Sequence, residues 1–243
     1  NCFVTAKLEL TLVENPKVQL NQSYILCESK ETIIDAGTGF DSYLWSTGET
    51  TSSIVINEAG NYHIKVTKDY GGVTCESENK NFTVSLSNTA TIIGIEKQEW
   101  TQDQNQIIIN TSGLGDYEYS IDGINYQRSN VFSNLRADIY TVFVKDRNGC
   151  GTVSQQIFLL NFPKFFTPNN DGLNDTWSIN FPHLEQGLKV YVLDRYSKLL
   201  KEINPNDHWD GRYNNIIMPA SDYWFKAIRT NGEVHNGHFT LKR

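Results

Sequence analysis

One motif occurs three times along the chain: a cysteine, a short polar stretch, and a strand-like run that leads into a linker. The copies start at Cys2, Cys75 and Cys150, about 70–75 residues apart. Each interval has the size of a short Ig-like sandwich. Such a repeat does not favour one large core, because each copy closes a small unit of its own. The sequence therefore predicts a string of β-modules.

The repeat also sets the expected boundaries. Residues 1–16 are interpreted as the last strand of a module that starts upstream. Residues 17–87 form a first complete Ig-like module, 88–161 a second one, and 162–243 a final domain with a different pattern. Because the chain opens at Asn1 without a methionine or a signal pattern, we expect it to be the tail of a longer secreted protein.

The local pattern favours strands over helices. Tyr62, Ile64 and Val66 alternate with polar residues and so fall on one face of a strand. The pair Asp122-Gly123 is typical of a hairpin turn. No run of about 18 apolar residues occurs, so no membrane-spanning helix is expected. The predicted fold class is all-β, as tandem Ig-like β-sandwich modules.

Charge excludes one class of function. The net charge is −7, and residues 1–87 carry 6 lysines against 11 acidic residues. Residues 161–243 are nearly balanced, with 10 basic and 9 acidic residues. Binding of nucleic acid needs a basic face, which this composition does not supply.

Enzymatic activity is not expected either. The sequence contains no GxSxG, HExxH, P-loop or GxGxxG pattern. Two carboxylate pairs, Asp194 with Asp210 and Asp171 with Asp175, could in principle supply an acid and a base. They lie in a small, turn-rich domain, whereas glycosidases usually need a larger fold with a deep cleft.

The cysteines predict one disulfide within the first complete module. A bridge between Cys27 and Cys75 would close about 48 residues and stabilise the module by about 3–4 kcal/mol. Trp45 would pack against this bridge, Cys2 would have its partner upstream, and Cys150 would remain a free or buried thiol. A disulfide implies the periplasm or the cell exterior. A metal site is disfavoured, because no CxxC spacing occurs and the histidines are scattered.

The final domain holds a dense cluster of oxygen-bearing side chains. Asn169, Asp171 and Asp175 are candidate ligands for Ca²⁺, with the carbonyl group of Leu173 as a further ligand. The alternative, which we favour, is a tight turn in which these side chains bond their own backbone and Gly172 supplies a positive φ.

Several phrases of the final domain carry a family resemblance. They are FFTPNNDGLNDTWSI, VYVLDRYSKLL, WDGRYNN, MPASDYWFKAI and NGHFTLKR, in that order. Together they resemble the type B C-terminal sorting domain of the type IX secretion system, carried by SprB-like gliding adhesins of Bacteroidetes. The run YEYSIDGINYQRSNVFSNLRADIYTVFVKDRNGC resembles the repeat units of those adhesins. YLWSTGETT with GNYHIKVT resembles PKD-like and Ig-like modules of bacterial surface proteins.

The resemblance implies a function and partners. The final domain would be a folded secretion and attachment signal, recognised by the type IX translocon after export to the periplasm. A SprF-like or PorP-like outer-membrane β-barrel would be a second partner, and the product would reach the cell surface without inserting into the membrane itself. The upstream modules would be spacers of a large adhesin.

Seven residues are candidates for partner recognition. The resemblance places Asp194 and Arg195 in a motif shared by the family; alternatively, Arg195 pairs with a carboxylate such as Asp210 or Asp175. The closing strand would add its edge to a partner's sheet, and its basic tip would meet acidic groups. The candidates on this strand and tip are Gly237, Phe239, Leu241, Lys242 and Arg243.

Two other functions remain open. An adhesive or carbohydrate-binding array would stack sugars on exposed aromatic residues such as Tyr43, Trp45 or Trp100. A purely structural stalk would use the final domain as a cap.

Overall fold

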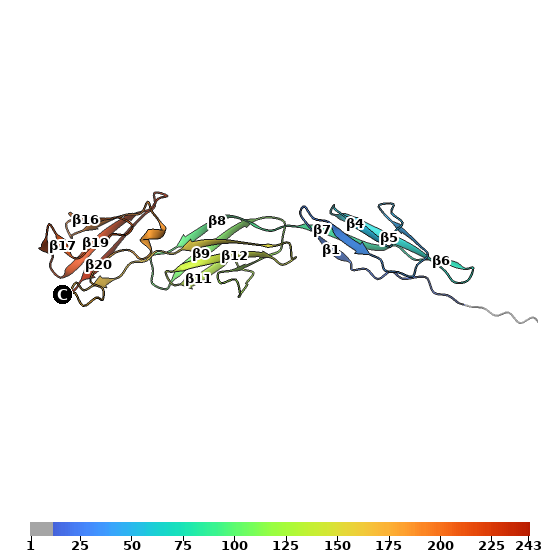
Figure 1. Cartoon of the computed structure of the whole chain (residues 1–243), viewed down its shortest axis with the longest axis horizontal. Helices are drawn as coiled ribbons and strands as arrows, with labels where there is room; N and C mark the ends of the chain where they lie inside the picture. The colour runs from blue at the N-terminus through green and yellow to red at the C-terminus, as the bar shows by residue number, and fades with distance from the viewer. Residues whose placement is uncertain (1–11) are drawn as a thin grey trace, which may run out of the picture. The chain divides into compact units, whose positions relative to one another are not determined.

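The computed structural model describes residues 12–243, which form twenty β-strands and one 3-10 helix, η1 (Figure 1). The fold is all-β and consists of tandem Ig-like sandwiches, which confirms the predicted class. Cys2 and most of the predicted strand over 1–16 lie outside the described residues. The chain divides into two compact units: the first contains the residues up to Thr91 with 112–117 and 145–152, and the second contains 92–111, 118–144 and 153–243.

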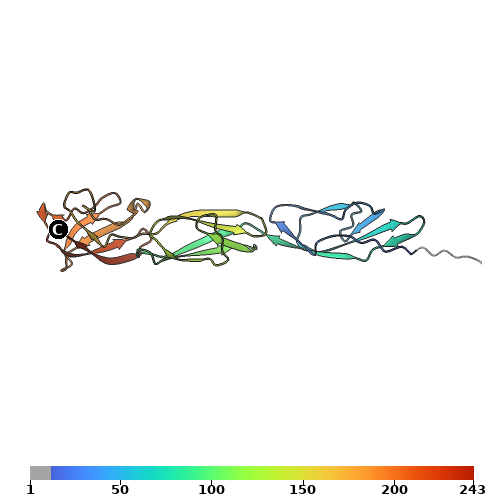
Figure 2. The same cartoon turned by 90° about the horizontal axis from the view of Figure 1, so that it is seen from below.

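The first sandwich has two sheets. One sheet has the strand order β1-β7-β5-β3, with β6 paired to β5, and β2 pairs with β4 in the other (Figures 1 and 2). The bounds are β1 Ser23–Cys27, β2 Thr32–Asp35, β3 Ser42–Trp45, β4 Ser53–Ile56, β5 Gly60–Asp69, β6 Thr74–Glu76 and β7 Lys80–Ser87. As the alternation predicts, Ile64 and Val66 are buried. Trp45 is buried with them, and its indole N–H donates to the carbonyl oxygen of Thr51 (2.8 Å).

The predicted Cys27–Cys75 disulfide is wrong. Strand β1 runs parallel to β7, which places Cys27 opposite Ser87. Cys75 lies opposite Lys68, near the other end of β5. The register puts eleven strand positions between the two cysteines, which is roughly 35 Å at about 3.3 Å per residue. A disulfide requires Cα atoms within about 7 Å of each other.

Cys27 instead forms a disulfide with Cys150, with the two Cα atoms 5.3 Å apart, and Cys75 is a free thiol. The turn that carries Cys150 is held by the buried carboxylate of Asp146. This carboxylate accepts hydrogen bonds from the Ser87 hydroxyl group (2.8 Å) and from the Cys150 backbone N–H (3.1 Å). Trp45 therefore packs without the bridge that the sequence predicted for it, and meets Phe82 edge-on.

The middle strands form two three-stranded sheets, β11-β9-β8 and β10-β12-β13. Their bounds are β8 Thr91–Gln98, β9 Asn105–Ser112, β10 Tyr117–Ser120, β11 Val131–Leu135, β12 Ile139–Asp146 and β13 Thr152–Phe158. Apolar residues of β9 and β12, including Ile107, Ile109 and Val142, are fully buried. The predicted turn at Asp122-Gly123 is confirmed: Gly123 has φ 74°, and the Asp122 carboxylate accepts bonds from the next backbone N–H groups. Because the two compact units share the segment 88–161, the three-way domain division stays a prediction.

The last domain has a five-stranded sheet of order β14-β20-β19-β15-β16, with a small β17-β18 ribbon (Figure 1). The bounds are β14 Phe165–Phe166, η1 Pro182–Leu184, β15 Lys189–Leu193, β16 Leu199–Ile203, β17 Arg212–Tyr213, β18 Ile216–Ile217, β19 Ser221–Ile228 and β20 Val234–Leu241. Its core is aromatic, with the indole of Trp177 stacked on the ring of Phe239 (centroids 3.8 Å apart). Trp209 is buried there as well.

Candidate functional site

The closing strand β20 is an integral part of the core. The side chains of Phe239 and Leu241 are fully buried. A Cβ atom on Gly237 would collide with the ring of Phe225, so this position packs without a side chain. The strand alternation turns both side chains inward, so neither side chain is exposed to a partner in the folded domain. Recognition of a partner through the backbone edge of this strand stays a prediction.

The tip of β20 is also not an open edge. The N–H of Thr240 donates to the carbonyl oxygen of Lys164 (2.9 Å), and the N–H of Lys242 donates to that of Phe166 (3.0 Å). Strand β14 therefore pairs with the end of β20, while β19 pairs with its other side. The end strands of this sheet are β14 and β16, and β14 pairs with β20 only at Thr240 and Leu241.

The two terminal basic residues lie at the surface. Arg243 donates to the carbonyl oxygen of Met218 (3.2 Å) and is exposed. The ammonium group of Lys242 lies 4.2 Å from the centre of the Phe165 ring, in a cation–π contact. The tip is thus attached to the domain through a backbone carbonyl and a ring, and it displays two cations.

Asp194 and Arg195 form the turn between β15 and β16. The Asp194 carboxylate accepts hydrogen bonds from the backbone N–H groups of Tyr196 (2.8 Å) and Lys198 (2.9 Å). Arg195 donates to the hydroxyl group of Ser221 (2.9 Å) rather than to Asp210 or Asp175. The predicted ion pair of Arg195 is therefore wrong, because both carboxylates are engaged elsewhere. The turn leaves the ring of Tyr196 83% exposed.

The loop 167–175 matches the turn that the sequence favoured over a calcium site. The Asp175 carboxylate accepts hydrogen bonds from the N–H groups of Asn169, Asn170 and Gly172. The side-chain amide of Asn169 donates to Asp171 (2.8 Å), which, with a bond from the N–H of Leu173, lowers the pKa of the Asp171 carboxyl group. Gly172 has the positive φ, 86°. Among residues 12–243, no group of three or more His, Cys, Asp or Glu side chains is arranged to hold a metal ion.

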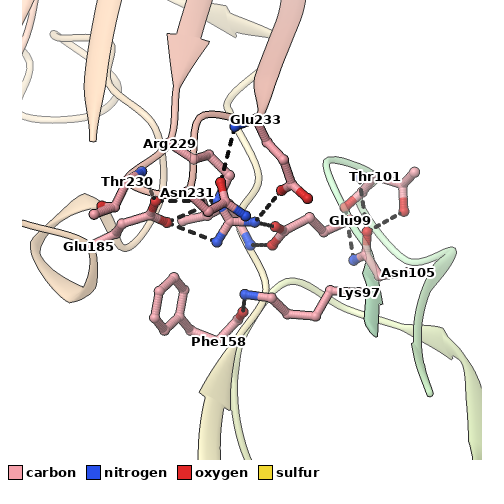
Figure 3. A network of polar contacts seen from close by, with 11 residues as sticks. Lys97, Glu99, Thr101, Asn105, Phe158, Glu185, Arg229, Thr230, Asn231 and Glu233 are labelled. Carbon is pink, nitrogen blue, oxygen red and sulfur yellow. Dashed lines mark hydrogen bonds and ion pairs between the residues drawn. The ribbon is translucent and has the colours of Figure 1, made fainter. Parts of the chain in front are cut away.

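A buried ion-pair network lies at the opposite end of the last domain (Figure 3). Arg229, with its side chain 8% exposed, donates to Glu185 through Nη2 (2.8 Å) and Nε (3.0 Å). Through Nη1 it also pairs with Glu99, which precedes β9 in the sequence. The side chains of Glu99 and Glu185 are only 3% and 9% exposed. We name these three residues the Arg229 cluster.

Every carboxylate of the Arg229 cluster has further partners. Glu99 accepts a hydrogen bond from the N–H of Leu160 (2.6 Å), and Glu185 accepts one from the N–H of Thr230 (2.8 Å). Burial by itself would raise the pKa of Glu185, but the bonds from Arg229 and Thr230 outweigh it and lower the pKa. Burial by itself would lower the pKa of Arg229, and its bonds to Glu185 reverse this, so the pKa rises. The buried polar atoms of the cluster therefore all have hydrogen-bond partners.

Aromatic stacking accompanies the ion pairs. The ring of Trp100 lies parallel to that of His235, with centroids 4.3 Å apart and planes 3° apart. Trp100 has φ 78°, an uncommon value for a bulky residue, and its N–H donates to the carbonyl oxygen of Leu160 (3.0 Å). Burial, followed by the charge of Lys164, lowers the pKa of His235.

The predicted sugar-stacking residues are not a free aromatic row. Trp45 is buried, Trp100 is covered by His235, and the hydroxyl group of Tyr43 donates to the carbonyl oxygen of Gly37 (2.8 Å). The aromatic residue that strand β19 does expose is Trp224, whose neighbours Tyr223 and Phe225 face the core as the alternation predicts. Within residues 12–243, no helix has the length and apolar character needed to cross a membrane.

Sequence reasoning missed the Arg229 cluster. Glu99 and Arg229 lie 130 residues apart, and neither belongs to a recognisable motif. Tyr196 was expected in the turn after Asp194 and Arg195 but was not among the candidates for partner recognition, although an aromatic residue inside a polar turn indicates an exposed ring.

Comparison with known proteins identifies a family for the last domain alone. Residues 160–241 match the model of the CHU_C Type IX secretion signal domain. This range begins two residues before the predicted boundary and ends at the last residue of β20. A search of curated proteins gave no match.

Solved structures are similar to this chain at low identity and low TM-score. The first eight Ig domains of Down Syndrome Cell Adhesion Molecule are 13% identical, with a TM-score of 0.34 over 91% of this chain and 36% of that one. PorZ, a surface component of the type IX secretion system of Porphyromonas gingivalis, is 12% identical, with a TM-score of 0.29 over 80% of this chain and 26% of that one. Latent PorU of the same organism is 11% identical, with a TM-score of 0.25 over 80% of this chain and 25% of that one. The chain thus spans about a third of the first of these structures.

The family match agrees with the order of phrases found in the sequence, and it places them on one folded domain. Residues 160–241 of this chain carry a type IX secretion signal domain.

Proposed function

We propose that the chain is the C-terminal part of a cell-surface adhesin, and that its last domain is a folded address for secretion and attachment. The observation that carries this proposal is the agreement between the matched range, 160–241, and a closed domain. The buried residues of one hydrophobic core are spread from Leu160 to Leu241, across the matched range. The secretion signal is thus a folded domain rather than an extended peptide, and its recognition depends on the surface of that domain.

The surface offered to the secretion machinery lies at the end of the domain where β15, β19 and β20 bring their termini together. The register sets Ser221 opposite Leu241, and Leu193 opposite Trp224. Exposed side chains at this end include Arg195, Tyr196, Lys242 and Arg243. Asp194 contributes by shaping the turn, because its oxygen atoms accept backbone bonds. An acidic partner would meet the cations, and the ring of Tyr196 would add apolar contact.

The partners and the upstream part follow from the same proposal. The machinery would be the type IX translocon, and a SprF-like or PorP-like outer-membrane β-barrel would hold the delivered protein at the surface. The two upstream sandwiches would act as spacers, since their described residues consist of packed strands and short turns. The Cys27–Cys150 bridge suits a spacer that works in an oxidising compartment.

The proposed surface is tested by replacing its charged and aromatic side chains. The whole chain is fused behind a periplasmic reporter in a bacterium that has the type IX system, and the exported fraction is measured. The variant Arg195→Gln/Tyr196→Ser/Lys242→Gln should lower the exported fraction at least tenfold and leave the melting temperature within about 2 °C, because none of these side chains is in the core. The matched control Lys65→Gln/Tyr70→Ser/Lys80→Gln likewise removes two cations and one tyrosine ring, here in the first sandwich, and should export normally. Normal export of the first variant would contradict the assigned surface.

A further inference from the structure

The Arg229 cluster connects the signal domain to a segment that the family match does not include. Arg229 and Glu185 lie inside residues 160–241, whereas Glu99 lies 61 residues before the start of that range. The network drawn in Figure 3 therefore crosses from the signal domain to the loop between β8 and β9. All of these residues belong to the same compact unit.

Hydrogen bonds hold the backbone of this loop in place for the contact. The side chain of Asn105 is buried; its oxygen accepts a hydrogen bond from the N–H of Thr101 (3.0 Å), and its amide donates to the carbonyl oxygens of Thr101 (3.1 Å) and Leu135 (2.9 Å). These bonds fix the backbone directly after Glu99 and Trp100. The ammonium group of Lys97, just before them, donates to the carbonyl oxygen of Phe158 (3.2 Å).

The apolar side of the contact completes the core of the signal domain. Trp100 and Phe158 pack against the cluster of buried residues that the matched range forms. Trp100 covers His235 and also lies near Phe225, with ring centroids 6.5 Å apart. Without the loop, the rings of His235 and Phe225 and the buried charge of Glu185 would lose part of their cover. The matched range alone is thus missing residues that its own core uses.

We infer that Glu99 and Trp100 are positioning residues of the secretion signal, and that the body recognised for export includes the loop between β8 and β9. This inference rests on the proposed function. A folded address is read through the placement of its surface, and the Arg229 cluster fixes the signal domain to this loop through Glu99, which pairs with Nη1 of Arg229. Glu185, inside the signal domain, holds the same guanidinium through Nε and Nη2. A desolvated ion pair to a guanidinium held in this way constrains orientation more than an apolar contact of the same size.

The test uses the whole chain behind a periplasmic reporter in cells that have the type IX machinery. Glu99→Gln removes one charge of the cluster, and Trp100→Ala removes the stack without leaving a charge unpaired. Glu96→Gln is the matched control, because Glu96 lies on β8 just before the loop and accepts an exposed hydrogen bond from Asn110. Hydrogen exchange of the β19 amides reports separately whether the signal domain stays folded.

We expect both variants to reduce the exported fraction at least tenfold while the β19 amides keep their protection, and Glu96→Gln to export like the unchanged chain. Export at the unchanged level in both variants would overturn the inference. So would a loss that always accompanies loss of β19 protection, since Glu99 and Trp100 would then act only in folding. If the unchanged chain itself is not exported, the proposed function fails, and this result is distinct from the other two.

Discussion

The guanidinium group of Arg229 lies between two buried carboxylates, so its removal would leave two negative charges facing each other out of water. Glu99 and Glu185 are both less than a tenth exposed. Breaking one partner of a buried ion pair typically costs about 3–5 kcal/mol, because the remaining charge is uncompensated. Arg212 offers a contrast in the same domain, since its pair with Asp210 is half exposed at 3.7 Å.

We therefore expect Arg229→Met to lower the free energy of unfolding by about 3–5 kcal/mol. Arg212→Met should lower it by less than about 1 kcal/mol, as is usual for exposed pairs. Urea denaturation followed by tryptophan fluorescence measures both. Equal losses of unfolding free energy in the two variants would show that the burial of the Arg229 cluster does not contribute to stability.

The lowered pKa of His235 predicts that the stability of the fold depends on pH. Its pKa is lowered in the folded state below the ordinary value of 6.5 by burial and by Lys164. The unfolded chain therefore binds more protons than the folded chain as the pH falls through 6.5, so acidification destabilises the fold in this window. We expect the melting temperature to fall between pH 7 and pH 5.5, and His235→Phe to flatten that fall. An unchanged slope in this variant would contradict the assignment.

At the level of single elements, the stability of the last domain depends on strand β20. Phe239 stacks on Trp177 and is buried, so Phe239→Ala should cost about 3–5 kcal/mol. Deletion of Arg243 alone removes an exposed side chain and should cost less than about 1 kcal/mol. Thermal unfolding of the two variants measures the difference. A small loss for Phe239→Ala would mean that the strand is peripheral.

The pairing of β1 with β7 determines the disulfide. Because Cys27 lies beside the end of β7, we expect a non-reducing digest to contain a linked Cys27–Cys150 peptide and an alkylated Cys75. Reduction should destabilise the first unit by about 4–5 kcal/mol in the loop-entropy model, since the bridge closes a loop longer than 100 residues. Mass spectrometry that finds a Cys27–Cys75 peptide instead would contradict this strand pairing.

Local patterns could be predicted from the sequence, and pairings across long distances could not. The alternation in β5 and the turn at Asp122-Gly123 depend on neighbours in the sequence, and these predictions are confirmed. The same kind of alternation places Phe239 and Leu241 in the core, whereas the prediction considered only the edge of the closing strand. The disulfide depends on a parallel strand pair and the Arg229 cluster on residues 130 apart, and no local pattern encodes either.

At the scale of the whole molecule, the disulfide and the buried ion pairs group the residues differently from the modules predicted by the sequence repeat. The Cys27–Cys150 bridge belongs to the first compact unit and the Arg229 cluster to the second. The middle segment 88–161 contributes to both units.

The central claim is that the last domain is a folded export address. The most direct measurement compares a periplasmic reporter that carries the whole chain with one that carries residues 1–159, in cells with the type IX machinery. Surface proteolysis of intact cells then measures the exposed fraction of each fusion. We predict that the whole chain brings the reporter to the surface and that the shortened chain leaves it in the periplasm. Equal surface exposure of the two fusions would contradict the account.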